Sequence, residues 1–209
     1  MTRDSNSRTD GWEVSDPGRY AYLLGCYLGD GHVTHKPPGT WTLRLACDPK
    51  YPGIEEEIST AIASVFVGCT PRRTSPADHS VDVLSVTNAA VRDAFPQHGP
   101  GPKHQRPMIL QEWQLEITRL HPDLLVRGLI HSDGCRTINR FRTLLPSGRV
   151  AEYSYVRYFF SNLSADIRNI FREHCGLLGI RVTQPNHRNR AIQHRDSVRI
   201  VERIVGAKC

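Results

Sequence analysis

Two apolar stretches have the length and the boundaries of helices. The first covers residues 20–28, follows the N-cap candidates Ser15 and Asp16 and a proline at position 17, and ends at Gly31. The second covers residues 123–132, follows a proline at position 122 and ends at Gly134. The pattern therefore predicts two helices, each of which ends in an Asp-Gly pair.

These two helices match residue by residue. Residues 23–31 read LLGCYLGDG and residues 126–134 read VRGLIHSDG, so 103 residues separate Asp30 from Asp133. This offset is about half the chain, which indicates an internal duplication.

The flanking segments agree with the duplication. Residues 43–45 resemble 156–158 as an inner strand, and segments 54–68 and 167–179 both show helical spacing and end on glycine. Further β-rich stretches are expected at 81–86 and 191–194, and short helices around Val91 and Val201. Lys103 follows Asp30 by 73 residues, and Lys208 follows Asp133 by 75. Each half is predicted to be helix, strand, strand, helix, strand, strand, helix, with residues 96–107, rich in Pro and Gly, as connector.

The pattern predicts three parts of the chain. Residues 1–16 are polar and lack the apolar groups needed to order them, so they are predicted to be a flexible tail. Residues 17–107 form the first lobe with the connector, and residues 108–209 form the second lobe. No apolar run has the length of a membrane span and the N-terminus is not signal-like, which favours a cytoplasmic location.

Charge and cysteine content narrow the function. Twenty-seven Lys and Arg against twenty-one Asp and Glu give a net charge of +6, which favours a polyanionic partner. Charge alone leaves open a basic enzyme that binds no nucleic acid. The six cysteines are scattered without C-x-x-C spacing, so they are expected to be reduced thiols rather than metal ligands.

The repeated frame L/V-x-G-x-x-x-x-D-G resembles the signature of LAGLIDADG homing endonucleases in their single-chain form with two motifs. Segments 160–162, 178–180 and 205–208 are also similar to bacterial members, so the resemblance covers residues 17 to 208. It implies an α+β fold with two pseudo-symmetric αββαββα lobes. The lobes would pack through the two motif helices, and their antiparallel sheets would form a saddle on DNA.

The motif helices carry small residues four positions apart, Gly25 and Gly29 in one and Gly128 and Ser132 in the other. Small residues let two helix backbones approach closely, and each interior glycine otherwise costs about 1 kcal/mol relative to alanine. Such packing would bring Asp30 and Asp133 together at the helix ends. Their mutual repulsion favours bound divalent metal, and Mg²⁺ suits oxygen ligands, with Mn²⁺ or Ca²⁺ as alternatives.

The resemblance also assigns roles around these aspartates. It implies that Asp30 and Asp133 bind the metal ions together with the backbone carbonyls of Gly29 and Ser132. Lys103 and Lys208 would polarise solvent or stabilise developing charge. The alternative is that both lysines are solvated surface residues.

The resemblance implies that alternate sheet residues face DNA in the major groove, where arginine reads guanine and lysine or arginine contacts phosphate. A single charged residue on a sheet is more often simply solvated. The candidates are Thr34, Lys36, Thr42, Arg44, Arg72 and Arg73 in the first lobe, and Thr137, Asn139, Arg157, Arg188, Arg190 and Arg195 in the second.

The function that this pattern favours is a monomeric, metal-dependent, site-specific double-strand DNA endonuclease. A non-cleaving DNA-binding transcriptional regulator with the same fold, or an RNA-splicing maturase, remains open. Both aspartates are present, which favours the enzyme over the regulator. Arg127 and His131 put polar groups where the family has apolar or small residues, and a looser interface is expected there.

Overall fold

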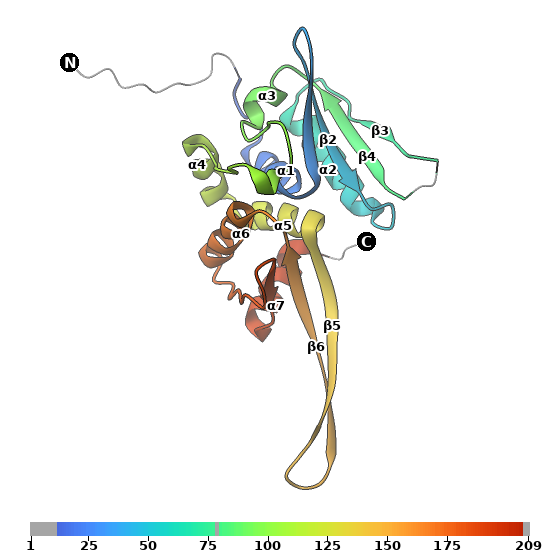
Figure 1. Cartoon of the computed structure of the whole chain (residues 1–209), viewed down its shortest axis with the longest axis vertical. Coiled ribbons are helices and arrows are strands. Elements are labelled where there is room, and N and C mark those ends of the chain that lie inside the picture. Colours follow the sequence, from blue (N-terminus) through green and yellow to red (C-terminus); the bar gives the residue numbers. More distant parts are fainter. Residues whose placement is uncertain (1–11, 78–79, 207–209) are drawn as a thin grey trace, which may run out of the picture.

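The chain forms two lobes that meet at a central helix pair, as seen in a computed structural model that describes residues 12–77 and 80–206 (Figure 1). The elements of the first lobe are α1 (Pro17–Asp30), β1 (Gly31–Lys36), β2 (Thr40–Cys47), α2 (Pro52–Val65), β3 (Arg72–Thr74), β4 (Asp82–Thr87) and α3 (Val91–Ala94).

A connecting region and the second lobe follow. The connector holds the 3-10 turn η1 (Lys103–Gln105) and helix α4 (Glu112–Leu120). The elements of the second lobe are α5 (Pro122–Asp133), β5 (Gly134–Leu144), β6 (Val150–Ser161), α6 (Ala165–Leu177), β7 (Asn189–Ile192) and α7 (Arg195–Val205). The predicted α+β fold and the start and end of both motif helices are confirmed.

The two antiparallel sheets differ in strand number. The first has the order β1-β2-β4-β3, whereas the second has only β5-β6-β7. The fourth strand predicted for the second lobe is wrong, because that segment makes a single bridge between Thr183 and Ala191. Pro185 has no N–H to donate to a ladder, and the backbone N–H of Arg181 donates instead to Ser197 Oγ at 2.9 Å.

Helix α1 lies inside the molecule. Every residue from Tyr20 to Leu28 is buried, so α1 is covered on all sides rather than along one stripe. Helices α2 and α5 pack against it. The removal of this whole apolar segment from water is the main contribution that stabilises α1 at the centre of the core.

Helices α1 and α5 run parallel and almost touch. A Cβ on Gly25 would lie 2.5 Å from the carbonyl oxygen of Leu125 and 2.8 Å from the backbone nitrogen of Leu129. A Cβ on Gly128 would collide with the carbonyl of Tyr22. Nearer the C-terminal ends, Gly29 lies against Ser132. The predicted close approach of the two helices is therefore present, and it depends on missing side chains.

The segment before α1 is packed. The Trp12 ring lies 6.1 Å from the Tyr20 ring and 5.9 Å from the Trp113 ring, and Ser15 Oγ donates to the carbonyl of Ser64 at 2.6 Å. Aromatic burial stabilises this arrangement. The flexible tail predicted for residues 1–16 is therefore wrong for residues 12–16, and residues 1–11 lie outside the described residues.

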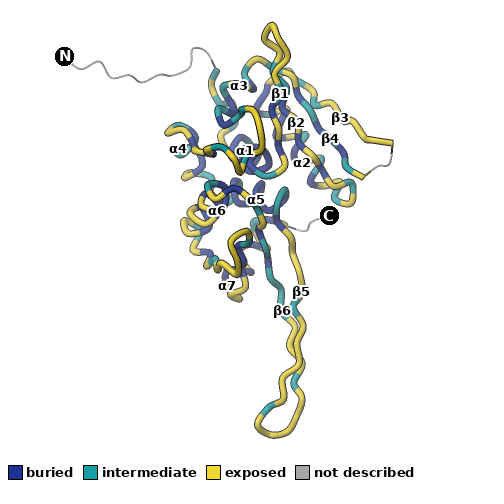
Figure 2. The backbone as a smooth tube through the Cα atoms, in the orientation of Figure 1, coloured by how far each residue is buried: buried dark blue, intermediate teal, exposed yellow. Residues whose placement is uncertain are grey.

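Each sheet has one covered face and one open face. Leu43, Leu45, Leu84 and Val86 are buried under the helices of the first lobe, while the alternate residues are exposed or half-buried. Figure 2 shows that burial is concentrated around the central helices and that the outer half of the β5–β6 hairpin is exposed. None of the helices in the described residues is long and apolar enough to cross a membrane.

Candidate functional site

The candidate site lies where the C-terminal ends of α1 and α5 meet. Asp30 and Asp133 are the last residues of the two helices, and each is followed directly by the first residue of a strand. A Cβ on Gly29 would come within 3.2 Å of Asp133 Oδ2, so Asp133 lies against the last turn of α1. The close packing of the helices thus brings an aspartate of each lobe to one place.

The glycine after each aspartate allows this sharp exit from the helix. A Cβ on Gly31 would lie 2.8 Å from the carbonyl oxygen of Tyr27, and one on Gly134 would lie 2.6 Å from that of Ile130. Both glycines have ordinary negative φ. They are needed for close approach to the preceding helical turn, rather than for a left-handed conformation.

Asp133 is half-buried and its carboxylate accepts a hydrogen bond from Asn162 Nδ2 at 2.5 Å. The pKa of Asp133 is raised to about 6, mainly by burial and also by the negative charge of Asp30, while Asn162 and Lys103 act in the opposite direction. The ionised form is therefore costly in the absence of a cation. Asp30, in contrast, is exposed.

Lys103 reaches the same place from the connector. Its ammonium donates to the carbonyl oxygens of Gly29 at 2.7 Å and Leu28 at 3.1 Å, and also to that of Tyr27. Burial lowers the pKa of Lys103 to about 8, although Asp133 and Asp30 favour its charged form. A cation at the C-terminal end of α1 is favoured by the helix dipole. Lys208, the second predicted lysine, lies outside the described residues.

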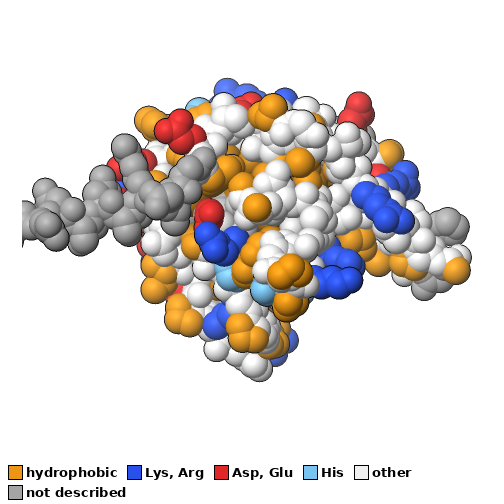
Figure 3. All heavy atoms as spheres, turned by 90° about the horizontal axis from the view of Figure 1, so that it is seen from above, with side chains coloured by type: hydrophobic (Ala, Val, Ile, Leu, Met, Phe, Trp, Pro, Cys, Tyr) orange, Lys and Arg blue, Asp and Glu red, His pale blue; other side chains and the backbone are white. Residues whose placement is uncertain are grey.

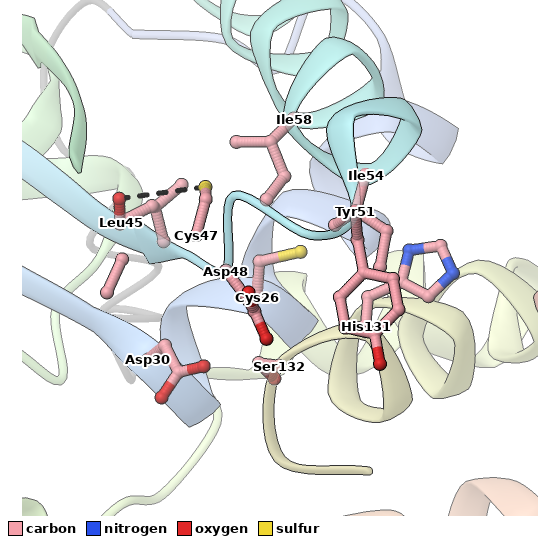
Figure 4. A pocket seen from close by; sticks show the side chains of 11 residues that line it. Cys26, Asp30, Leu45, Cys47, Asp48, Tyr51, Ile54, Ile58, His131 and Ser132 are labelled. Atoms are coloured by element: carbon pink, nitrogen blue, oxygen red, sulfur yellow. Dashed lines mark hydrogen bonds between the residues drawn. The ribbon is translucent and has the colours of Figure 1, made fainter. Parts of the chain in front are cut away.

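A cavity of about 120 Å³ adjoins Asp30 and is also lined by Ser132, the residue before Asp133. Figure 4 shows Asp30, Asp48 and Ser132 close together at this cavity. Within residues 12–77 and 80–206, no three His, Cys, Asp or Glu side chains form a group that could hold a metal ion. Any cation at this site would therefore depend on the carboxylates of Asp30 and Asp133, on backbone carbonyls and on ligands from outside the protein.

Asn162 was missed as a site residue by the sequence reasoning, although its segment was noted in the resemblance. Its Oδ1 accepts from the backbone N–H of Ser164 at 2.7 Å, so the amide is held while Nδ2 points to Asp133. Asp48 forms the corresponding turn in the first lobe, where its Oδ1 accepts a hydrogen bond from the backbone N–H of Lys50 at 3.0 Å. The available signal was a polar Asn or Asp immediately after an inner strand, which is common in ordinary turns.

The polar residues of the motif helix α5 connect the lobes. Arg127 donates to Glu57 of α2 at 2.7 and 3.0 Å, and to the carbonyl of Ile204 at 2.6 Å. His131 is buried, with its ring nitrogens 3.0 Å from Tyr22 Oη and 3.1 Å from the carbonyl oxygen of Val205. The expected looser interface is wrong at Arg127 and His131, because both side chains have partners across or beside it.

The open face of the first sheet carries most of the residues predicted for it. Strand pairing puts Thr34 opposite Thr42, and Arg44 opposite His32 and Ser85, while Arg72 lies opposite Ser85 on its other side. Lys36 has the same parity as Thr34 and is exposed. The end of the molecule seen in Figure 3 carries its Lys and Arg side chains in separate groups among apolar and uncharged atoms.

The open face of the second sheet carries Thr137, Asn139 and Arg157. Thr137 pairs with Arg157, and Asn139 pairs with Tyr155. Asn139 donates to Tyr155 Oη at 2.8 Å, and the guanidinium of Arg157 lies over the Tyr155 ring at 4.7 Å. Arg44 pairs with the second residue after Asp30, which is His32. Arg157 pairs with the fourth residue after Asp133, which is Thr137. The predicted match of residues 43–45 with residues 156–158 is therefore wrong by two residues of strand register. A shift of two residues leaves the side chains on the same face of the sheet.

Three predicted interface residues do not belong to the open faces. Arg73 is opposite Leu84 and makes ion pairs with Glu55 at 3.1 Å and Asp82 at 2.6 Å on the covered side. Arg190 is opposite Phe160 and is buried. Arg195 begins helix α7 and is not a sheet residue, whereas Arg188 is exposed in the loop before β7. Strand parity and the helix boundary were misjudged at these positions.

The comparisons with known proteins concern the fold. No protein-family model and no curated protein matches the sequence. Among solved structures, the homing endonuclease I-DmoI in complex with DNA and Ca has a TM-score of 0.57 at 17% identity, covering 91% of each chain. The LAGLIDADG meganuclease I-AabMI bound to uncleaved DNA has a TM-score of 0.55 at 8% identity, covering 90% of this chain and 82% of that one.

A third similar structure is the LAGLIDADG homing endonuclease I-LtrWI bound to target DNA. It has a TM-score of 0.51 at 10% identity and covers 90% of this chain and 82% of its own. At these identities the likeness establishes the fold alone. The chain has the fold of LAGLIDADG homing endonucleases, with both lobes on one chain.

Proposed function

We propose that this chain, which has the LAGLIDADG homing endonuclease fold, is a site-specific endonuclease that hydrolyses both strands of DNA with divalent metal ions. The observation that carries the proposal is the meeting of Asp30 and Asp133 at the ends of two parallel, nearly touching helices. Structurally similar proteins bind DNA, and I-DmoI has been studied with DNA and Ca, Mn or Mg.

The residues at the site fit a hard cation. The available donors are the carboxylates of Asp30 and Asp133 and the carbonyl oxygens of Gly29 and Ser132, all of them oxygen. The Gly29 carbonyl already faces a positive charge, the Lys103 ammonium, and the raised pKa of Asp133 reflects a carboxylate whose burial Asn162 and Lys103 compensate only in part. When bound, Mg²⁺ would lower the pKa of a water molecule and neutralise charge on the phosphate.

The remaining site residues would position the reacting groups. Asn162 holds the carboxylate of Asp133 in a fixed orientation through the 2.5 Å hydrogen bond. Lys103 supplies a positive charge that can stabilise an oxyanion. The tight α1–α5 contact fixes the separation of Asp30 and Asp133, which matters because small displacements of reacting groups cost large factors in rate.

The open sheet faces would bind the duplex on both sides of this centre. Thr34, Thr42 and Arg44 in the first lobe and Thr137 and Arg157 in the second lie on strands that start or end beside the aspartates. Hydroxyl and guanidinium groups can donate to base edges and phosphates. Since each half of the site comes from one lobe of the same chain, the active form would be a monomer.

The test is selection of bound duplexes from a random DNA library, followed by incubation of the selected duplex with Mg²⁺. We expect one preferred site, cleavage of both strands within it, and no cleavage in EDTA. A protein that binds its selected duplex but never cuts it with Mg²⁺ or Mn²⁺ is a regulator rather than a nuclease. Preference for structured RNA over every duplex would support the maturase reading instead.

Binding should also fall steeply with salt, because a protein that covers many phosphates releases counterions. We expect a negative slope in a plot of the logarithm of the binding constant against the logarithm of salt concentration. A slope near zero would remove DNA from the proposal. In the same buffers, light scattering should give the mass of a monomer at low micromolar concentration.

A further inference from the structure

The two lobes carry hairpins of very different length. The β1–β2 hairpin has six paired positions, from Gly31↔Leu45 to Lys36↔Thr40. The β5–β6 hairpin has eleven, from Gly134↔Phe160 to Leu144↔Val150. Strand β7 pairs only with residues 158–161 of β6. The outer part, residues 139–155, is here called the distal hairpin, and it projects beyond the lobe as a two-stranded ribbon (Figure 1).

The distal hairpin has a strip of aromatic side chains on one face. Phe141 is opposite Tyr153, their rings are stacked at 5.1 Å, and the Tyr155 ring meets Phe141 edge-on at 5.9 Å. Phe141 is 43% exposed and Tyr153 is 45% exposed. By pairing parity, this strip continues the open face that carries Asn139 and Arg157. The strip is therefore an outward continuation of the proposed DNA-facing surface.

The ribbon is also strongly basic. Residues 134–161 contain five arginines and one acidic residue, Glu152. Arg142 uses that glutamate in an ion pair at 2.6 Å, and Arg136 pairs with Glu202 of α7. Arg140 and Arg149 are exposed. This excess positive charge favours an anionic partner and disfavours pairing with a second copy of the same basic hairpin.

A two-stranded ribbon alone is marginally stable in water, and a contiguous patch of exposed apolar side chains often marks an interaction site. A DNA major groove admits a two-stranded ribbon, and aromatic side chains can contact the methyl group of thymine there. Five additional pairs extend the hairpin by about 16 Å at roughly 3.3 Å per residue. That length corresponds to about five base pairs at 3.4 Å each.

We propose that the distal hairpin lies in the major groove beyond the symmetric core of the target, and that Phe141 and Tyr153 select thymine-containing base pairs there. The half-site of the second lobe is then about five base pairs longer than that of the first. This inference rests on the proposed function, since it requires a duplex held across the two sheets.

The test uses the full chain and the duplex selected from a random library. In the wild type, we expect the selected sequence to be asymmetric about the cleavage position, with T·A pairs specified at one outer end. Replacing those outer pairs by G·C should weaken wild-type binding about tenfold or more. This arm of the experiment needs no mutant protein.

The double variant Phe141→Ala/Tyr153→Ala should bind the unaltered duplex more weakly and should no longer distinguish outer T·A from G·C. Ile138→Ala is the matched control, because Ile138 is 47% exposed on the same strand but faces the opposite side. It should discriminate as the wild type does. Ile138→Ala should also cleave the core site as the wild type does.

Three results would overturn the inference in distinguishable ways. If the wild type cleaves its duplex but is indifferent to the outer base pairs, the inference fails and the proposed function stands. If the wild type binds no duplex at all, both fail. If light scattering shows a wild-type dimer that Phe141→Ala/Tyr153→Ala converts to monomer, the strip is a self-association surface rather than a DNA contact.

Discussion

The first lobe carries a four-stranded sheet and a hairpin of six pairs, whereas the second carries a three-stranded sheet and a hairpin of eleven pairs. The motif helices of the two lobes, in contrast, match in direction, in their small contact residues and in their terminal aspartates. The duplication is therefore kept where the two copies touch. The strands have diverged where each lobe is free of the other.

The same comparison applies around the two aspartates. Strand β2 is followed by Asp48 and strand β6 by Asn162, and each side chain accepts a backbone N–H two residues later. Only the amide can donate a hydrogen bond, and it donates to Asp133. The local turn is thus shared while the polar environment of the aspartates differs, so the two halves of the site are not chemically equivalent.

The largest expected effect comes from filling the helix contact. Gly25→Ala places a Cβ 2.5 Å from the carbonyl oxygen of Leu125, so the helices must separate. We expect a loss of about 3 kcal/mol or more in the free energy of unfolding, measured by urea denaturation. Gly176→Ala in α6 is the control, because its Cβ would meet nothing within 4 Å. That variant should be unchanged or more stable by up to about 1 kcal/mol.

A smaller effect should appear when the half-buried carboxylate of Asp133 is neutralised. Asp133→Asn should raise the free energy of unfolding in EDTA at neutral pH by roughly 1–3 kcal/mol, because burial raises the pKa of Asp133 to about 6 and its ionised form destabilises the fold above that pH.

The sign of the pH dependence follows from the same shift. The raised pKa means that the folded state prefers the protonated acid, so the wild-type penalty fades as the pH falls from about 6 to below about 4. The gain of Asp133→Asn should shrink over that window. Asp196→Asn, at an exposed aspartate of α7, should change stability by less than about 0.5 kcal/mol at every pH. A gain that does not depend on pH would contradict the electrostatic cause.

The smallest expected effect comes from replacing an arginine on either face of the first sheet, Arg44 on the open face or Arg73 on the covered face. Arg44→Ala removes a guanidinium from the open face and should reduce DNA affinity about tenfold, with a salt slope smaller in magnitude by about one if Arg44 contacts a phosphate. Arg73→Ala should lower thermal stability instead, because Glu55 and the buried Asp82 lose their ion-pair partner. Equal losses of DNA affinity in both variants would contradict the assignment of faces.

The sequence predicted the centre of the molecule better than its periphery. The glycine spacing and the Asp-Gly endings identified both motif helices, because backbone contact leaves a visible constraint on residue size. The fourth strand predicted for the second lobe is absent from the described part of that lobe, since whether the segment at Thr183 forms a strand or only a single bridge depends on tertiary packing. The faces of Arg73 and Arg190 were misjudged because one residue of strand register reverses the direction of every side chain.

Some site features had no clear signal in the sequence. The bond between Asn162 and Asp133 joins residues 29 positions apart, and the contact of Lys103 with the end of α1 depends on how the connector folds back. Lys103 was nevertheless a predicted residue because of its position in the repeat. The polar links of Arg127 and His131 were expected to weaken the interface, and their partners Glu57 and Tyr22 became visible only in the fold.

The most direct measurement is cleavage of the selected duplex in Mg²⁺ by the wild type, Asp30→Asn and Asp133→Asn at equal occupancy of the DNA. Asparagine keeps the shape of each side chain and removes the charge that would recruit metal, so each variant should lose double-strand cleavage while binding the duplex at least as tightly as the wild type. Circular dichroism should first confirm that both variants are folded. Normal cleavage by either folded variant would contradict the proposal that the two aspartates form the nuclease centre.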